Sequence, residues 1–356
     1  MRVALIVPPF ISVPPQRYGG TELFASHLAE GLANAGVDVV LYTNGESTLP
    51  VERKWLYPRG QWPLEGEIFE NLTDINHAAW AVRDAAESCD LIHVSNAPAL
   101  VHSRFLDTPF VYTIHHPHQK GLSDFYTHYP DIHYVAISDF QRKQERMPKL
   151  RTIHHGIDMT LYEAPREKRT HLSFLGRIAP VKGTHVAIQV AKKAGIPLKI
   201  AGEIQPMFQE YYETLVKPHV DGKFIEYVGE ADLAAKNELL GKSLGFLFPI
   251  QWDEPFGLVM IEAMACGAPV LAFPHGSVPE VVKDGVSGYV CNSVEQMAMR
   301  ARLCDKFNPA EVRSYVVLNF SVDKMVKQYI NLYSEILETT LATTDTLATG
   351  EATAAA

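Results

Sequence analysis

Two glutamates, Glu254 and Glu262, flank the start of an expected helix and could together bind the hydroxyl groups of a ligand. They lie in the segment 249–267, which reads PIQWDEPFGLVMIEAMACG. Proline suits the first turn of a helix and disfavours helical geometry in the residue before it, so we expect Glu254 in a loop and a helix over 257–264. The first amides of a helix lack internal partners and carry partial positive charge, which suits hydroxyl or phosphate oxygens. The segment therefore predicts a ligand-binding corner.

The simpler interpretation of either glutamate alone is structural: Glu254 would cap the helix, and Glu262 would be a solvated surface charge. The flanking sequence argues against it. The apolar runs at 244–249 (LGFLFP) and 268–273 (APVLAF) are typical of two buried parallel strands with the helix between them. Ligands of such sheets bind beyond the carboxyl ends of the strands, where the loop that holds Glu254 must lie.

Two cations, Arg177 and Lys182, lie in the loop GRIAPVKG at 176–183, after an expected strand at 171–175 and before an expected helix at 184–194. Arginine offers a planar fork of donors and lysine a mobile point charge, and both would lie at the positive end of the helix. Either cation alone is more simply a solvated surface charge. Together, on the same edge as Glu254, they predict a diphosphate site.

Gly19 and Gly20 form a second turn between a strand and a helix, after an expected strand at 2–8. Two glycines let the backbone approach a ligand closely. The six-residue dinucleotide fingerprint is missing, so a nicotinamide site is unsupported.

Three histidines, His115, His116 and His118, follow an expected strand at 110–114 and raise the possibility of a metal site. Pro117 constrains the local chain, and no neighbouring carboxylate or cysteine completes a recognisable ligand set. We therefore expect no metal, and we interpret His115, at the end of the strand, as lining the ligand cleft.

Composition excludes several other classes. The chain has 356 residues, of which 47% are hydrophobic and 21% charged, with a net charge of -9 and a pI near 5.9. This balance argues against nucleic acid as a partner and provides no polybasic membrane footprint, so we expect at most peripheral membrane contact. No apolar run is long enough to span a bilayer. The cysteines are far apart in sequence, which favours a reducing, cytoplasmic location; they are Cys89, Cys266, Cys291 and Cys304.

The alternation of strands and helices predicts two doubly wound α/β domains, over 1–160 and 161–321, with the charged segment 159–170 as linker. The segment 46–70 is rich in proline, glycine and aromatic residues. We interpret its aromatics as packing residues, with acceptor binding as the minority alternative. The Ala/Thr-rich end, 341–356, is predicted to be disordered.

Taken together, these motifs resemble family 4 of the retaining glycosyltransferases, which have the GT-B architecture of two Rossmann-like domains facing each other across a cleft. The resemblance covers the chain to about residue 340, and its most specific part is Glu254 to Glu262, which resembles the family's motif of two glutamates separated by seven residues. Shorter motifs support it in order: YGGTE at 18–22, TIH at 113–115, HHGID at 154–158, GRIAPVKG at 176–183 and PEVVKDGVSGYV at 279–290.

The resemblance implies a nucleotide-sugar donor in the second domain and an acceptor, either a small molecule or a saccharide, on the first. Arg177 and Lys182 would hold the diphosphate, Glu262 the ribose hydroxyls and Glu254 the sugar hydroxyls, while His115 would contact the transferred sugar near its reacting carbon. A last helix at about 322–340 would pack back on the first domain. The implied donor-binding residues are Gly19, Gly20, Arg177, Lys182, Glu254, Phe256, Gly257, Leu258, Val259 and Glu262, and the implied catalytic residues are His115, Arg177, Lys182 and Glu254.

The function implied is the transfer of a hexose, with retention and an α-linkage, from a nucleoside-diphosphate sugar to a hydroxyl acceptor, without a metal ion or other cofactor. A UDP-sugar such as UDP-glucose is favoured, and GDP-mannose comes next. The alternatives are a nucleotide-sugar epimerase on the same architecture and a non-catalytic nucleotide-sugar-binding protein. The base, the sugar, the acceptor, the oligomeric state and the roles of 46–70, His116, His118 and His155, where the family often has asparagine, are left open.

Overall fold

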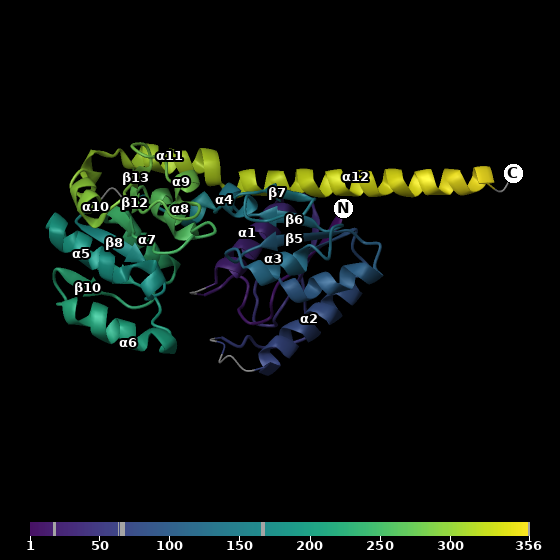
Figure 1. Ribbon diagram of the computed structural model, residues 1–356, viewed down its shortest axis with the longest axis horizontal. Coiled ribbons are helices and arrows are strands. Elements are labelled where there is room, and N and C mark those ends of the chain that lie inside the picture. The colour runs from purple at the N-terminus through teal and green to yellow at the C-terminus, as the bar shows by residue number, and fades with distance from the viewer. Residues whose placement is uncertain (17–18, 63, 65–67, 165–167, 355–356) are drawn as a thin grey trace.

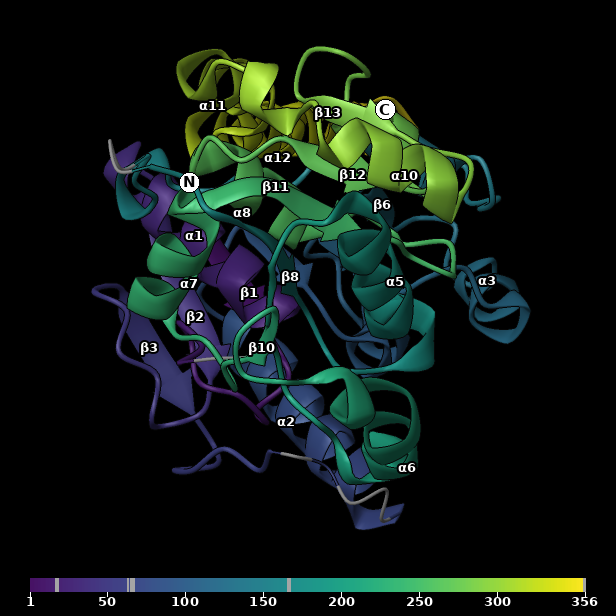
Figure 2. The ribbon, with the colours of Figure 1, turned by 90° about the vertical axis from the view of Figure 1, so that its left-hand side faces the viewer.

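Two parallel β-sheets, each covered by helices on both faces, make up the protein in a computed structural model (Figures 1 and 2). The structure describes residues 1–16, 19–62, 64, 68–164 and 168–354. Tyr18 of the YGGTE motif and Pro165 of the expected linker lie outside the described residues.

The first sheet has the strand order β3-β2-β1-β4-β5-β6-β7, and its pairs are all parallel. The central strands are short apolar runs buried on both sides, as parallel sheets require. The strands are β1 (Arg2–Ile6), β2 (Asp38–Thr43), β3 (Glu52–Trp55), β4 (Leu91–Val94), β5 (Phe110–Ile114), β6 (His133–Ala136) and β7 (Leu150–Thr152).

The second sheet has the order β10-β9-β8-β11-β12-β13, again with parallel pairs. In both sheets the chain winds outward first to one side and then to the other, which is the doubly wound arrangement. The predicted α/β class is therefore confirmed. The strands are β8 (His171–Leu175), β9 (Leu198–Ala201), β10 (Ile225–Tyr227), β11 (Ser243–Phe248), β12 (Val270–Ala272) and β13 (Gly288–Val290).

Helices connect the strands. Those of the first half are α1 (Gly20–Asn34), α2 (Ile68–Ala86), the 3₁₀ helix η1 (Ala97–Phe105), α3 (Lys120–Tyr126) and α4 (Asp139–Arg142). Those of the second half are α5 (Thr184–Ala194), α6 (Gln209–Tyr211), α7 (Leu233–Gly241), α8 (Leu258–Ala265), α9 (Val278–Val281), α10 (Val294–Ala301), α11 (Pro309–Phe320) and α12 (Val322–Ala354).

Helix α12 joins the two halves. Ser321, just before it, bridges to Ile157 in the segment between the sheets, and the helix then runs across the first sheet (Figure 1). Its buried side chains share a core with α1, β1 and β2. Gly31 of α1 allows this packing, because a Cβ there would collide with Val326. The α12 side chains in this core are Met325, Val326, Tyr329, Leu332, Tyr333 and Ile336.

The predicted disorder of 341–356 differs from the structure, in which α12 continues to Ala354. Alanine has the highest helix propensity, and no proline interrupts this stretch, so the helix can extend from its packed part.

The excursion 46–70 also differs from expectation. It contains the edge strand β3, and three of its four aromatic residues are more exposed than packing residues: Trp55, Trp62 and Phe69 are 48%, 40% and 56% exposed. Tyr57 is half-buried and accepts a hydrogen bond of 3.0 Å from Asn76 Nδ2. Trp55 belongs to the edge strand β3, which has a neighbouring strand on one side only, and Phe69 lies in the first turn of α2.

Candidate active site

Lys182 and Glu254 form an ion pair between two loops of the second domain. Lys182 Nζ lies 2.5 Å from Glu254 Oε2, and Trp252 Nε1 donates a hydrogen bond of 2.9 Å to the same oxygen. The ammonium also lies 4.9 Å from the centre of the Trp252 ring. The two charged side chains are only 15% and 12% exposed, so each is largely shielded from water and depends on the other.

The sheet order brings these loops together. Lys182 follows β8 and Glu254 follows β11, and the two strands are paired. The backbone amide of Gln251 donates to the carbonyl of Val181 at 2.8 Å. Gly183 has a φ of +75°, and a Cβ there would collide with the carbonyl of Pro249, so only glycine permits this contact between the loops.

A third loop, after β12, holds the backbone around Glu254. The amide of Ser277 donates to the carbonyl of Glu254 at 3.0 Å, and Ser277 Oγ donates to the carbonyl of Phe256 at 2.8 Å. Gly276, with a φ of +62°, lies so close that a Cβ would collide with the backbone of Glu254. The position of Glu254 is thus set by three loops at the carboxyl edge of one sheet.

Helix α8 starts at Leu258, one residue later than predicted, and neither Pro255 nor Phe256 belongs to it. Gly257 is its N-cap with a φ of +79°, a left-handed conformation that cannot be part of a right-handed helix. The first amides of α8, those of Leu258 and Val259, nevertheless lie directly after the loop of Glu254.

Glu262, in the second turn of α8, is 3% exposed, so it is not a solvated surface charge. Its Oε1 accepts hydrogen bonds from the hydroxyl of Tyr162 at 2.8 Å and from Lys236 Nζ at 3.1 Å. Burial, reinforced by the Glu262 carboxylate, raises the pKa of Tyr162 far above its ordinary value. Tyr162 therefore stays a hydrogen-bond donor over the whole physiological pH range.

Arg177 lies near the start of the loop that ends with Lys182. Gly202, after the neighbouring strand β9, is so close that a Cβ would collide with the carbonyl of Gly176. Burial raises the pKa of the adjacent Glu203, while the charge of Arg177 lowers it in part. Arg177 therefore lies beside the carboxyl ends of β8 and β9, on the same edge of the sheet as Glu254.

The glycine turn of the first domain reaches the start of α8. Gly19 is the N-cap of α1 with a φ of +146°, and a Cβ on Gly20 would come within 3.9 Å of Leu258 Cδ1. Glu22, in the first turn of α1, is 6% exposed, and burial raises its pKa to about 7. The two halves of the predicted donor site thus meet between Gly20 and Leu258.

His115 directly follows β5 and lies close to His155 of the segment between the sheets. Its Nε2 is 3.3 Å from Ser95 Oγ, and its ring stacks on that of His155 at 5.5 Å between centroids. His155 in turn contacts Phe256 at 5.2 Å. Burial lowers the pKa of His115 well below its ordinary value and that of His155 to about 3, so both rings are neutral at pH 7.

The neighbouring histidines have separate partners. His116 Nε2 lies 2.6 Å from the hydroxyl of Tyr126, and His118 Nδ1 lies 3.0 Å from Glu145 Oε1. The part of the chain that the structure describes contains no group of three or more His, Cys, Asp or Glu side chains that could hold a metal ion.

Two family models match consecutive parts of the chain. The model described as Glycosyltransferase Family 4 matches residues 18–161, and that described as Glycosyl transferases group 1 matches residues 163–307. This chain belongs to glycosyltransferase family 4.

Proteins of similar sequence or similar fold cover most of the chain. The chain is 24% identical to spore coat protein SA of Bacillus subtilis (strain 168), with 88% of this chain and 92% of that protein covered. Its fold is similar to that of AviGT4, a glycosyltransferase involved in avilamycin A biosynthesis, with a TM-score of 0.70, 23% identity and coverage of 95% and 98%. It is also similar to Anabaena Alr3699/HepE in complex with UDP and glucose, with a TM-score of 0.74, 19% identity and coverage of 93% and 99%. The predicted GT-B architecture is confirmed.

Several polar residues of this glycosyltransferase that contact the predicted site were not identified from its sequence. Trp252, two residues before Glu254, could have been noticed as a neighbouring donor. Lys236 lies 26 residues before Glu262, too far for a local pattern to signal the contact. Tyr162 lies 100 residues before Glu262, and no local pattern signals that contact.

A hydrogen-bonded contact also joins the two domains beside His155. The carboxylate of Glu280 accepts hydrogen bonds from the amides of Asp139 and Phe140, at 2.7 and 2.5 Å, at the start of α4. His154 Nε2 lies 3.1 Å from the same carboxylate. A side chain of the second domain thus caps a helix of the first, with the favourable charge for a helix amino end.

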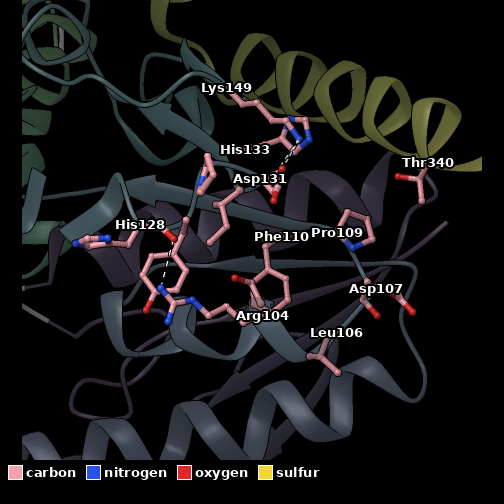
Figure 3. A pocket seen from close by; sticks show the side chains of 15 residues that line it. Arg104, Leu106, Asp107, Pro109, Phe110, His128, Asp131, His133, Lys149 and Thr340 are labelled. Carbon is pink, nitrogen blue, oxygen red and sulfur yellow. Dashed lines mark hydrogen bonds and ion pairs between the residues drawn. The ribbon is translucent and has the colours of Figure 1, made fainter. Parts of the chain in front are cut away.

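A cavity of about 250 Å³ lies at the opposite edge of the first sheet, where β5 and β6 begin (Figure 3). Lys149, His133 and Asp131 lie on one side of Phe110, and Arg104 lies on the other. None of the predicted site residues of this glycosyltransferase lines it.

The helices were also compared with the length and hydrophobicity that a membrane span requires. Among the described residues, no helix meets both requirements.

Proposed function

We propose that this glycosyltransferase moves a hexose from a nucleoside-diphosphate sugar to a hydroxyl acceptor with retention of configuration, forming an α-linkage without a metal ion. The observation that carries the proposal is the shielded Lys182–Glu254 pair beside the start of α8. A sugar diphosphate offers each member of this pair a new partner: phosphate oxygens for the lysine and sugar hydroxyls for the carboxylate.

Positive charge in the site explains how the nucleoside diphosphate can depart as the leaving group. Cleavage of the sugar–phosphate bond places negative charge on the diphosphate, and Lys182, Arg177 and the first amides of α8 are positioned to stabilise it. The released phosphate oxygen then accepts the proton of the acceptor hydroxyl as that hydroxyl attacks the same face of the sugar. No metal is needed in this scheme, because the cations and helix amides supply the positive charge.

Neutral His115 suits a contact with the transferred sugar. As an uncharged ring it can donate or accept one hydrogen bond without competing with the diphosphate for cations. It belongs to the first domain, and its stacking on His155 brings it toward Phe256 of the second domain.

A UDP-sugar, such as UDP-glucose, is the favoured donor, followed by GDP-mannose. The solved structure of Alr3699/HepE with UDP and glucose supports this order. Glu262, held by Tyr162 and Lys236, is the residue proposed to accept the ribose hydroxyls, which both donors share.

The experiment is a thermal-shift panel of UDP, GDP and ADP and their common sugar conjugates, with and without a chelator. A ligand that binds only the folded state raises the melting temperature by mass action. We expect stabilisation by one nucleotide and its sugars, unchanged by chelator. Stabilisation that disappears with chelator would contradict metal independence, and stabilisation by none of the compounds would contradict the donor site.

A further inference from the structure

Asn96 follows β4 at the carboxyl edge of the first sheet and has an unsatisfied polar atom. The residue is 5% exposed, and its Oδ1 is buried without a hydrogen-bond partner among the described residues. A buried amide oxygen without a donor costs free energy. Such an atom in a folded protein therefore needs an explanation.

The ordinary structural role of an asparagine at this position is not filled. Asn96 is the N-cap of η1, yet its side chain makes no capping hydrogen bond to the described residues of this helix, 97–105. An N-cap asparagine normally accepts a hydrogen bond from the second or third amide of the helix. Here the side chain instead donates, from Nδ2, to Asp74 Oδ1 of α2 at 2.8 Å.

Asp74 of α2 is the hydrogen-bond partner of Asn96. Its carboxyl group accepts the hydrogen bond from Asn96 through one oxygen, and no described lysine, arginine or histidine forms an ion pair with it. Burial raises the pKa of Asp74 above its ordinary value. Asn96 Oδ1 is thus an acceptor that this pair leaves unsatisfied, on the side chain that is hydrogen-bonded to the carboxyl group of Asp74.

The location connects this pair to the predicted reaction. Strand β4 is paired with β5, and His115 directly follows β5. Ser95, adjacent to Asn96 in the chain, lies 3.3 Å from His115 Nε2. Asn96 and His115 therefore lie at the ends of neighbouring strands, on the same edge of the sheet, and Asp74 of α2 is hydrogen-bonded to Asn96.

We propose that Asp74 and Asn96 bind a pair of hydroxyl groups on a polyol acceptor, a sugar or a cyclitol, and so select the acceptor. The inference rests on the proposed function, which requires a hydroxyl acceptor, and adds the chemical class and the residues that recognise it. A carboxylate and an amide oxygen attract O–H donors and repel phosphate or carboxylate groups. A site built to hydrogen-bond hydroxyls also discriminates strongly against analogues that lack them.

The test uses the full chain, with the nucleotide sugar that stabilises it most, and a panel of glucose, mannose, N-acetylglucosamine, sucrose and myo-inositol. Nucleotide release measures transfer. Asp74→Asn and Asn96→Ser are compared with Glu87→Gln, which removes an exposed carboxylate just beyond the far end of α2. We expect the acceptor KM to rise about tenfold or more in the two site variants and to stay unchanged in the control, while stabilisation by the free nucleotide is the same in all.

Two outcomes would overturn the inference. One is an acceptor KM in both site variants that equals that of the wild type. Another is a nucleotide-stabilised wild type that uses none of the panel. Loss of nucleotide stabilisation in the wild type itself would instead count against the proposed donor site, so the two failures are distinguishable.

Discussion

The hydroxyl of Tyr162 donates a 2.8 Å hydrogen bond to Glu262, a carboxylate 100 residues later in the chain. Tyr162 lies just before the second sheet and Glu262 in the second turn of α8, and Lys236 of α7 binds the same oxygen at 3.1 Å. Two donors on one oxygen orient the carboxylate. Glu262 is therefore held by contacts from two other parts of the chain.

We expect Tyr162→Phe and Lys236→Met each to weaken nucleotide binding by about tenfold, because each removes one hydrogen bond that orients a buried carboxylate. Glu262→Ala should weaken it further. Calorimetric titration with the nucleotide identified by thermal shift measures the effect. Lys242→Met, at the end of α7, is the control and should bind normally. Equal affinity in the Glu262 variant and the wild type would contradict the ribose assignment.

Arg177→Ala and Lys182→Ala are expected to lower turnover by about 100-fold while changing nucleotide affinity much less. The reason is that both cations stabilise charge that develops as the diphosphate leaves. Steady-state kinetics and nucleotide titration separate the two effects. Lys192→Ala, which removes an exposed cation of α5, should be fully active. Unchanged turnover in both site variants would be incompatible with the diphosphate role.

Gly276→Ala should destabilise the protein and reduce turnover, because a Cβ at this position would collide with the backbone of Glu254. We expect a loss of at least about 2 kcal/mol in the free energy of unfolding. Gly285→Ala is the matched control: it has a similar φ of +74° but open space around its Cβ. It should lose only about 1 kcal/mol and keep its activity. Denaturant titration and kinetics on both variants provide the comparison, and equal activity losses would contradict the collision argument.

Glu22 should make stability depend on pH. Its folded pKa of about 7 lies above the ordinary value of 4.5, so the fold favours the protonated carboxyl. That contribution is complete below about pH 4.5 and is lost as the pH rises through 7. Glu22→Gln cannot ionise, so its stability lacks this pH dependence. When the pH rises from 5 to 8, we expect the unfolding free energy of the wild type to fall by roughly 2 to 3 kcal/mol relative to that of the variant. Urea titrations at both pH values measure this difference. A constant difference between the two proteins would show that Glu22 is ionised in the fold.

Much of the secondary structure could be predicted, because its signals are local. The limits of β5, β8 and α5 agree with those expected from the sequence, since apolar runs and a terminal glycine mark them. The short strand β10 and the exposed edge strand β3 were missed. Each is only a few residues long, and β3 lacks the buried face that produces a hydrophobic pattern.

The sequence by itself determined the two doubly wound domains and the loops that carry Arg177, Lys182 and Glu254, because strand ends and helix starts are encoded by neighbouring residues. Tertiary structure alone decided which side chains meet there. The Lys182–Glu254 pair depends on the pairing of β8 with β11, and the partners of Glu262 come from distant segments. The unsatisfied oxygen of Asn96 is likewise visible only in the folded chain, since burial and missing partners are properties of packing and not of sequence order.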